Sequence, residues 1–184
     1  MIDWVDQSSE RMGDKDLYAQ LLGVTSPWQV TDVKLAWSQG TVTVHVGQDP
    51  QGPLCCPTCA QPSPGYDSRP RRWHALDTCQ YRTILVADVP RVRCAKNGVV
   101  TSSVPWPEPG SGFTALFEAL ETDWLKEASV AAVARIMGLS WNAIDGVMQR
   151  AVARGLLRRA TARCTVVHLG DDEPAFRKRR DDCV

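Results

Sequence analysis

The amino-acid sequence predicts an α+β fold in which a small β-rich part precedes a helical part. Alternating apolar residues mark strands upstream of residue 104, and apolar residues at helical spacing recur from residue 113 to about residue 159. Between them, the run PWPEPG at residues 105–110 is a stiff, non-helical connector. We therefore expect a proline-rich linker at residues 105–112.

Composition and charge describe a globular chain with a basic end. The 184 residues suffice for one ordinary domain or two small ones, and the formal net charge is zero. The first sixteen residues lean acidic, whereas residues 150–180 are rich in arginine, which is compatible with phosphate binding. We find no signal peptide and no run long enough to span a membrane. With an odd count of seven cysteines, this favours a reducing, cytoplasmic location.

Residues 1–54 are expected to form a helix and a β-hairpin. The helix covers residues 10–23, where Gly23 occupies the C-cap position. Strands follow at residues 29–38 and 41–47, joined by a tight turn at Gly40. His45 falls on the polar face of the second strand, where solvation is the expected role.

The cysteines of residues 55–104 indicate a zinc-ribbon-like domain. Cys56 and Cys59, spaced as CxxC, form a knuckle that can bind one tetrahedral metal ion, and Cys94 supplies a third thiolate. Residues 61–70 are expected to be turn-rich and residues 81–93 extended. The fourth ligand is expected at Asn97, whose neutral amide oxygen is a poor ligand for zinc.

Three other side chains could complete the metal site, namely Cys55, His74 and Cys79. We favour His74 because a neutral imidazole completes a Cys3His site without adding charge. A polar residue in a ribbon strand is an equally good explanation of His74. The predicted ligands are thus Cys56, Cys59, Cys94 and His74, for a structural Zn²⁺ of reduced affinity.

Residues 113–163 are expected to form a helix-turn-helix domain. Its first helix covers residues 113–124, with Phe113, Leu116, Phe117 and Leu120 on a common face. In residues 130–149, small Ala134 lies where two helices would cross, and Gly138 occupies the turn, which requires a positive φ. Apolar spacing alone also fits two core helices of a bundle, but the alanine, the glycine and the downstream arginines favour the helix-turn-helix.

The helix at residues 141–154 is then the recognition element, capped by Ser140. Arginines at i, i+4 and i+8 share one helix face and predict phosphate contacts, with a solvated face as the alternative. The residues predicted to contact DNA are Ser140, Trp141, Asn142, Asp145, Gln149, Arg150, Arg154 and Arg158.

Five short motifs occur in order along the chain: CPTC at 56–59, WHALDT at 73–78, VPRVRC at 89–94, VPWPEPGSGF at 104–113 and GDDEPAFRK at 170–178. In this combination the chain resembles the N-terminal part of the ISL-three family of insertion-sequence transposases. The resemblance implies a zinc ribbon, helix-turn-helix DNA-binding elements and an RNase H-like catalytic domain with a DDE acidic triad. It places the first acidic position at Asp172, and it departs from the family at Asn97, where His or Cys is usual.

The resemblance makes residues 164–184 the first strand of a truncated RNase H-like domain. A DDE site gathers three carboxylates around two divalent ions. Only the first of these positions, Asp172, lies within residues 164–184, and Asp181 and Asp182 are too close in sequence to replace the others. We therefore expect no functional catalytic residue and no enzymatic activity from the chain as written.

The expected function is sequence-specific binding of double-stranded DNA at transposon terminal inverted repeats, helped by Arg69, Arg71 and Arg72. Such a protein could repress transposition, with a homodimer or a full-length transposase as partner and without a membrane. One alternative is a zinc-ribbon adaptor that binds another protein through Trp4, Trp28 and Trp37. The other is the N-terminal portion of an active DDE transposase, if the chain continues.

Overall fold

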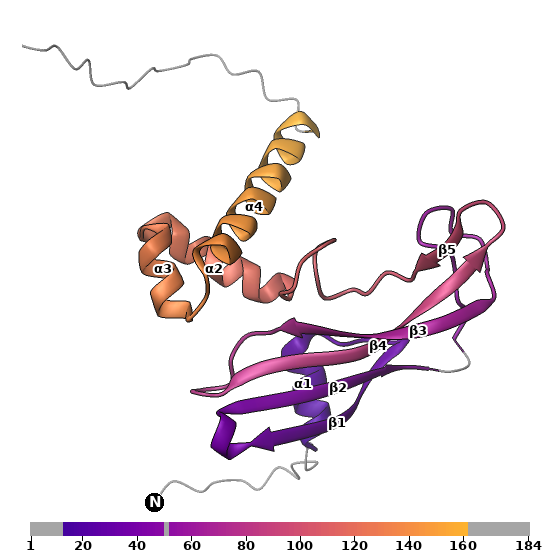
Figure 1. The fold of residues 1–184 in the computed structure, drawn as a ribbon, viewed down its shortest axis with the longest axis horizontal. Helices are drawn as coiled ribbons and strands as arrows, with labels where there is room; N and C mark the ends of the chain where they lie inside the picture. The colour runs from indigo at the N-terminus through magenta and orange to yellow at the C-terminus, as the bar shows by residue number, and fades with distance from the viewer. Residues whose placement is uncertain (1–12, 50–51, 162–184) are drawn as a thin grey trace, which may run out of the picture.

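The computed structural model describes residues 13–49 and 52–161, in which a β-sheet with one flanking helix precedes three further helices (Figure 1). The α+β prediction is confirmed. The predicted first strand of an RNase H-like domain, residues 164–184 with Asp172, lies outside the described residues. The elements are α1 (Asp14–Leu22), β1 (Trp28–Ala36), a 3-10 turn (Trp37–Gln39), β2 (Thr41–Gln48), β3 (Gly65–His74), β4 (Arg82–Cys94), β5 (Gly98–Thr101), α2 (Ala115–Glu127), α3 (Val130–Met137) and α4 (Trp141–Thr161).

One continuous sheet joins the N-terminal hairpin to the ribbon. The strand order is β1-β2-β4-β3, and β5 pairs with the distal part of β4. The pairing of β2 with β4 is parallel, with Val44 opposite Leu85, whereas the other pairs are antiparallel. The expected boundary at residue 54 is therefore crossed by strand pairing. The hairpin and the ribbon share one sheet and one hydrophobic core.

Helix α1 covers one face of this sheet and buries Tyr18 and Leu22 against it. Three tryptophans extend the same core. The ring of Trp106 meets the rings of Trp28 and Trp73 edge-on, with centroid separations of 5.0 and 5.4 Å. Because Trp106 belongs to the expected linker and is 6% exposed, this segment is part of the core instead of a free connector.

Strand β3 occupies much of the segment that the sequence predicts to be turn-rich. It begins at Gly65 and runs through Pro70 to His74. Proline lacks an N–H group, so it fits a strand that is paired on one side only. In the described sheet β3 pairs with β4 alone, and Pro70 lies opposite Asp88. The turn prediction for residues 65–70 is wrong, because an edge strand tolerates the proline and glycine on which that prediction rested.

The three helices are attached to the sheet at His74. Its N–H group donates to the carbonyl of Gly112 at 2.9 Å, and its carbonyl accepts from the N–H of Thr114 at 3.0 Å. Its imidazole lies 4.4 Å from the ring of Phe117, centroid to centroid, and 6.1 Å from that of Phe113. Main-chain and ring contacts therefore fix the start of α2 against the end of β3.

Helix α2 buries a different face from the one predicted. Phe117 is buried as expected, but Leu116 and Leu120 are 47% and 40% exposed. The fully buried neighbours of Phe117 on this helix are instead two carboxylates, Glu118 and Glu121. Apolar spacing predicted the wrong buried face of α2, because partners on α4 that are distant in sequence make the burial of Glu118 possible.

Glu121 is buried without a compensating partner. In the described part of the chain neither of its carboxylate oxygens has a hydrogen-bond partner. Burial and the nearby charge of Glu118 raise the pKa of Glu121 to about 7, against a smaller opposing effect of Arg150. A pKa above the unfolded value means that the folded state binds this proton more tightly. This contribution to stability is therefore complete at low pH and is lost as the pH rises towards 7.

We predict that Glu121→Gln raises the melting temperature more at pH 8 than at pH 5. At pH 8 the substitution removes a buried, unpaired charge, whereas at pH 5 the wild-type carboxyl is already neutral. Each 1 kcal/mol of stabilisation corresponds to about 2–4 °C for a chain of this size. Thermal melts of zinc-loaded protein at both pH values test this, with Glu127→Gln at the exposed end of α2 as control. Equal shifts at both pH values would contradict the assignment.

Candidate metal centre and nucleic-acid interface

Three cysteine thiols converge at the distal end of the β3–β4 hairpin. Cys94 is the last residue of β4, and Cys56 and Cys59 lie in the tight turn that precedes β3. The N–H of Cys56 donates to the carbonyl of Gln61 at 2.9 Å, which closes this turn. The three Sγ atoms all lie within 4.8 Å of one another.

This arrangement fits a structural zinc ion. Zn–S bonds of about 2.3 Å in a tetrahedron place sulfur atoms about 3.8 Å apart, a spacing compatible with the observed cluster. Cys56 and Cys94 are buried together with Val92, and Leu54 and Val100 pack against them. Zinc held here would tie the loop before β3 to the end of β4, as a cross-link and not as a reaction centre.

The local backbone favours thiolates at two of the three positions. Burial acts to raise the pKa of Cys56, but N–H groups of Cys59 and Thr58 and the Asn97 amide lower it to about 6. N–H groups of Asn97 and Lys96 lower the pKa of Cys94. A hydrogen bond to the backbone at Gln61 acts to lower the pKa of Cys59, yet Cys94, burial and Cys56 together raise it. A bound cation deprotonates such thiols outright.

Asn97 lies at the fourth corner, as its position in the sequence predicts, but it acts there as a hydrogen-bond donor. Its Nδ2 atom is 3.4 Å from Sγ of Cys56 and 3.6 Å from Sγ of Cys94. The amide therefore stabilises negative sulfur in the place where a histidine or cysteine would ligate the metal.

His74 is not a metal ligand in this structure, contrary to the prediction. It pairs with Ile84, ten residues along β4 from Cys94, which corresponds to about 33 Å of strand. Its Nε2 atom instead lies 2.8 Å from Oδ1 of Asp77, in the junction with α2. The two other candidates, Cys55 and Cys79, are exposed free thiols outside the cluster.

We predict about one zinc ion per chain, lost on Cys56→Ser and retained on Cys55→Ser. The neighbouring thiols form a matched pair, because only Cys56 faces the cluster. Asn97→His, which offers a true fourth ligand, should tighten zinc binding in chelator competition. Metal analysis of purified protein measures the first effect, and full zinc occupancy of Cys56→Ser would contradict the site.

Helices α3 and α4 form the predicted helix-turn-helix. Gly138 ends α3 with φ 63°, and Oγ of Ser140 accepts from the N–H of Ala143 at 3.2 Å to cap α4. Val133 and Ile144 are fully buried between the helices, with Ala134 beside them. The turn glycine, the cap and the small residue at the helix crossing are as expected.

The first turns of α4 present polar and aromatic side chains to solvent. Trp141 is 54% exposed, and Asn142 and Gln149 are also exposed. Nε2 of Gln149 donates to Oδ2 of Asp145 at 2.6 Å. This hydrogen bond holds in place two side chains that are both predicted to contact DNA. The start of α4 is thus a free, hydrogen-bonding helix surface of the kind that reads base edges in a major groove.

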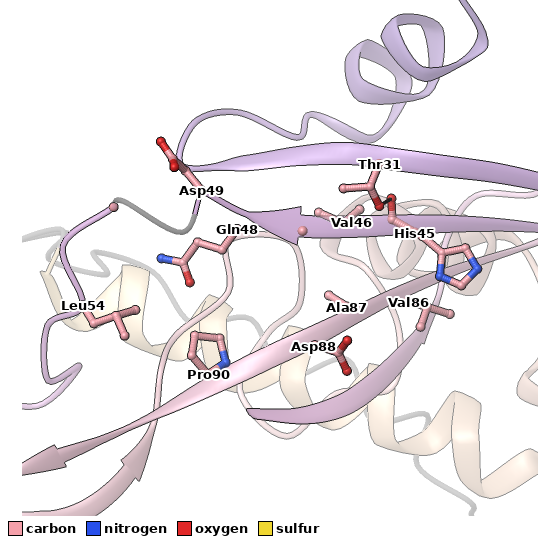
Figure 2. A pocket seen from close by; sticks show the side chains of 12 residues that line it. Thr31, His45, Val46, Gln48, Asp49, Leu54, Val86, Ala87, Asp88 and Pro90 are labelled. Atoms are coloured by element: carbon pink, nitrogen blue, oxygen red, sulfur yellow. Dashed lines mark hydrogen bonds between the residues drawn. The ribbon is translucent and has the colours of Figure 1, made fainter. Parts of the chain in front are cut away.

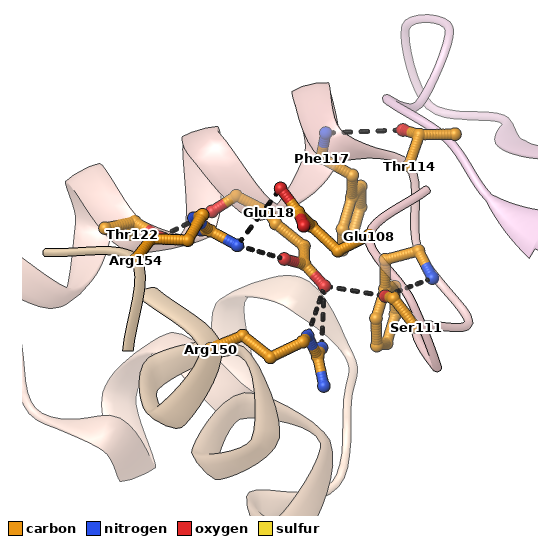
Figure 3. Close-up of polar contacts among 9 residues, drawn as sticks. Glu108, Ser111, Thr114, Phe117, Glu118, Thr122, Arg150 and Arg154 are labelled. Atoms are coloured by element: carbon orange, nitrogen blue, oxygen red, sulfur yellow. Dashed lines mark hydrogen bonds and ion pairs between the residues drawn. The ribbon is translucent and has the colours of Figure 1, made fainter. Parts of the chain in front are cut away.

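Two of the predicted phosphate-binding arginines are directed inward instead (Figure 3). Nε of Arg150 donates to Oε1 of buried Glu118 at 2.8 Å, and Nη1 of Arg154 donates to Oε2 at 3.2 Å. Ser111 also donates to Glu118, and Arg154 lies 3.5 Å from Glu108. The i, i+4 spacing places Arg150 and Arg154 on one helix face, as expected, but this face packs on α2. Arg158, further along α4, is exposed.

The open face of the sheet carries a groove of about 420 Å³ (Figure 2). His45, Val86 and Asp88 line it, so His45 is half-buried and not fully solvated.

In residues 13–49 and 52–161, only the three cysteines form a cluster that could hold a metal ion. Across the same residues, every helix is too short or too polar to cross a bilayer.

The tryptophans considered for a protein-binding surface have different positions. Trp28 is buried in the core, Trp37 is 73% exposed at the β1–β2 turn, and Trp4 lies outside the described residues. The sequence prediction missed Glu118, which lies outside the apolar face formed by Phe113, Leu116, Phe117 and Leu120, so helical spacing gave no sign of its burial. It also missed Arg91 and Arg93, which alternate along β4 with buried residues.

Two family models match the chain, and their ranges agree with this geometry. The zinc-finger of transposase IS204/IS1001/IS1096/IS1165 matches residues 52–96, which include the three cysteines. The helix-turn-helix domain of transposase family ISL3 matches residues 102–152, which include α2, α3 and the first half of α4. Searches of curated proteins and of solved structures found no match. With more than half of its 184 residues matched by these two domains in this order, the chain belongs to the ISL3 family of transposases.

Proposed function

We propose that this protein recognises a specific duplex sequence, the terminal inverted repeat of a transposable element, through the first turns of α4. The observation that carries the proposal is the capped start of α4, held by the Gly138 turn and exposing Trp141, Asn142 and Gln149. Asn and Gln side chains can form paired hydrogen bonds with adenine in the major groove. An aromatic side chain beside them adds apolar contact with bases or sugars.

The ion pairs behind α4 support the proposal that its first turns recognise DNA. Arg150 and Arg154 hold the helix on Glu118, so its inner face is fixed and its outer face is available. Recognition requires such a preorganised surface, because ordering it on binding would weaken affinity. The polar residues at the start of α4 are accordingly the specificity determinants in the proposal, and the arginines behind them are positioning residues.

We propose further that the residues described here bind DNA without cutting it, and that they act by occupying element ends. Phosphoryl transfer at a DDE site uses two divalent ions. Within the described residues, the sole candidate metal cluster consists of thiols, which suit zinc. A chain bound at an end would compete with an intact transposase, as a second copy or as a mixed complex. The same recognition would serve an active transposase if a catalytic domain follows.

We predict that selection from random duplexes by the zinc-loaded protein converges on one sequence. Binding to it should weaken linearly in log salt, as counterion release requires. Asn142→Ala should reduce the preference for the selected duplex over a shuffled one by roughly 5- to 150-fold, the range for one lost base contact. Fluorescence anisotropy measures both duplexes, with Gln20→Ala, an exposed amide on α1, as the control.

Selection without convergence, or no duplex binding at low salt, would overturn the assignment. Repression has its own readout in the same assay. Excess protein should displace an intact ISL3 transposase from the selected duplex, and failure to do so at saturation would remove the repressor role while leaving recognition intact.

A further inference from the structure

Four arginines of the β3–β4 ribbon lie on one face. Opposite residues in an antiparallel pair share a face, and alternate residues along a strand return to it. Arg69 and Arg71 lie opposite Val89 and Ala87, and positions 91 and 93 follow on the same side of β4. Arg72, opposite Val86, belongs to the other face. The arginine row consists of Arg69, Arg71, Arg91 and Arg93.

The row is available to an anionic partner. Arg69, Arg71 and Arg93 are exposed, and in the described structure none of them forms an ion pair with a carboxylate. Arg91 is held by both carboxylate oxygens of Asp67. The row therefore offers three guanidinium groups that make no ion pair, of which Arg69 lies within the field of Asp67, and one, Arg91, that Asp67 fixes in place.

Tyr66 organises the distal end of the row. The guanidinium carbon of Arg91 lies 5.4 Å from its ring centroid, and that of Arg93 lies 4.9 Å away. Arginine stacked on an aromatic ring keeps its N–H donors free in the plane of the fork. Tyr66 itself is 49% exposed, so the ring remains reachable from the same side.

The cysteine cluster lies behind this surface. Val92 and Cys94 alternate with Arg91 and Arg93, and both pack into the apolar shell of the metal centre. The strand that carries the distal arginines is therefore anchored on its opposite face. Zinc at the cluster would stiffen the backbone of the row without touching any ligand bound there.

Charge in the described chain is concentrated here and not on the helices. Residues 65–96 carry seven Lys and Arg against three Asp, whereas residues 115–161 carry six basic against five acidic residues. Two of those six, Arg150 and Arg154, form ion pairs with the same carboxylate, Glu118. Phosphate binding draws on unpaired arginine and lysine, so the ribbon is the better-suited part of the molecule.

The row also has the dimensions of a DNA strand. Its members occupy register positions 87, 89, 91 and 93 of β4, a span of about 20 Å at about 3.4 Å per residue. One strand of duplex DNA presents a phosphate about every 3.4 Å along the axis. A row of this length can therefore contact several phosphates of one strand.

We propose that the arginine row is a second DNA-contact surface, which binds backbone phosphates of the duplex whose sequence α4 reads. The inference rests on the proposed function, because the partner is the same duplex. The arginine row then contributes affinity for DNA, and α4 contributes sequence specificity. Tyr66 positions Arg91 and Arg93 and packs against the sugar–phosphate backbone beside them.

The test is the salt dependence of binding by the full zinc-loaded chain, using a mixed-sequence 40-bp duplex (about four helical turns). Each lost phosphate contact reduces the slope of log Kobs against log salt by about 0.9. Arg69→Gln combined with Arg93→Gln should therefore reduce the slope by about 2, and Arg93→Gln alone by about half as much. The matched control is Lys34→Gln combined with Lys126→Gln, which removes the same charge from exposed residues elsewhere.

The supporting result is a reduced slope in the arginine variants only, with zinc content unchanged and the preference for the selected duplex retained. An unchanged slope in a wild-type-like fold would overturn this inference while leaving recognition by α4 intact. Equal effects in the control would overturn it as well, since net charge alone would explain them. Absence of any duplex binding by the wild type would overturn both proposals together.

Discussion

Because Glu118 is buried, its carboxylate must find partners inside the protein, and Arg150 and Arg154 of α4 provide them. Removing one partner of such a buried ion pair typically costs about 3–5 kcal/mol, since the remaining charge stays uncompensated. The angle at which α4 leaves the three-helix unit is therefore set by electrostatics as well as by packing of Val133 and Ile144. A helix held from behind in this way can present its other side without rearrangement.

The sheet and the helices form one assembly, although the sequence suggests modules. The backbone of His74 pairs with residues 112–114, and Trp106 completes the core between Trp28 and Trp73. The cysteine cluster and the recognition helix lie at different ends of this assembly (Figure 1). The paired strands β3 and β4 span the distance between them, with Cys94 at one end and His74, the junction with α2, at the other.

Features with a local cause could be predicted from the sequence. Gly138 had to adopt a positive φ, Ser140 had a free N–H to cap, and CxxC spacing brings two thiols together within one turn. Features that depend on a distant partner could not. His74 was predicted to be a metal ligand, but the register of β3 against β4 places it far from the cysteines. Arg150 looked solvent-facing because Glu118, its partner, precedes it by more than thirty residues.

The parallel pairing of β2 with β4 bears on how the chain folds. Val44 and Leu85 are neighbours in the sheet but stand about forty residues apart in sequence, and closing a loop of that length is entropically costly and slow. Until β4 arrives, the hairpin leaves the edge of β2 open to pairing with other chains. The intervening loop contains Cys56 and Cys59, which meet Cys94 at the end of β4. Metal capture during synthesis would shorten this loop before the sheet closes, so zinc supply would influence the yield of native protein and its tendency to aggregate.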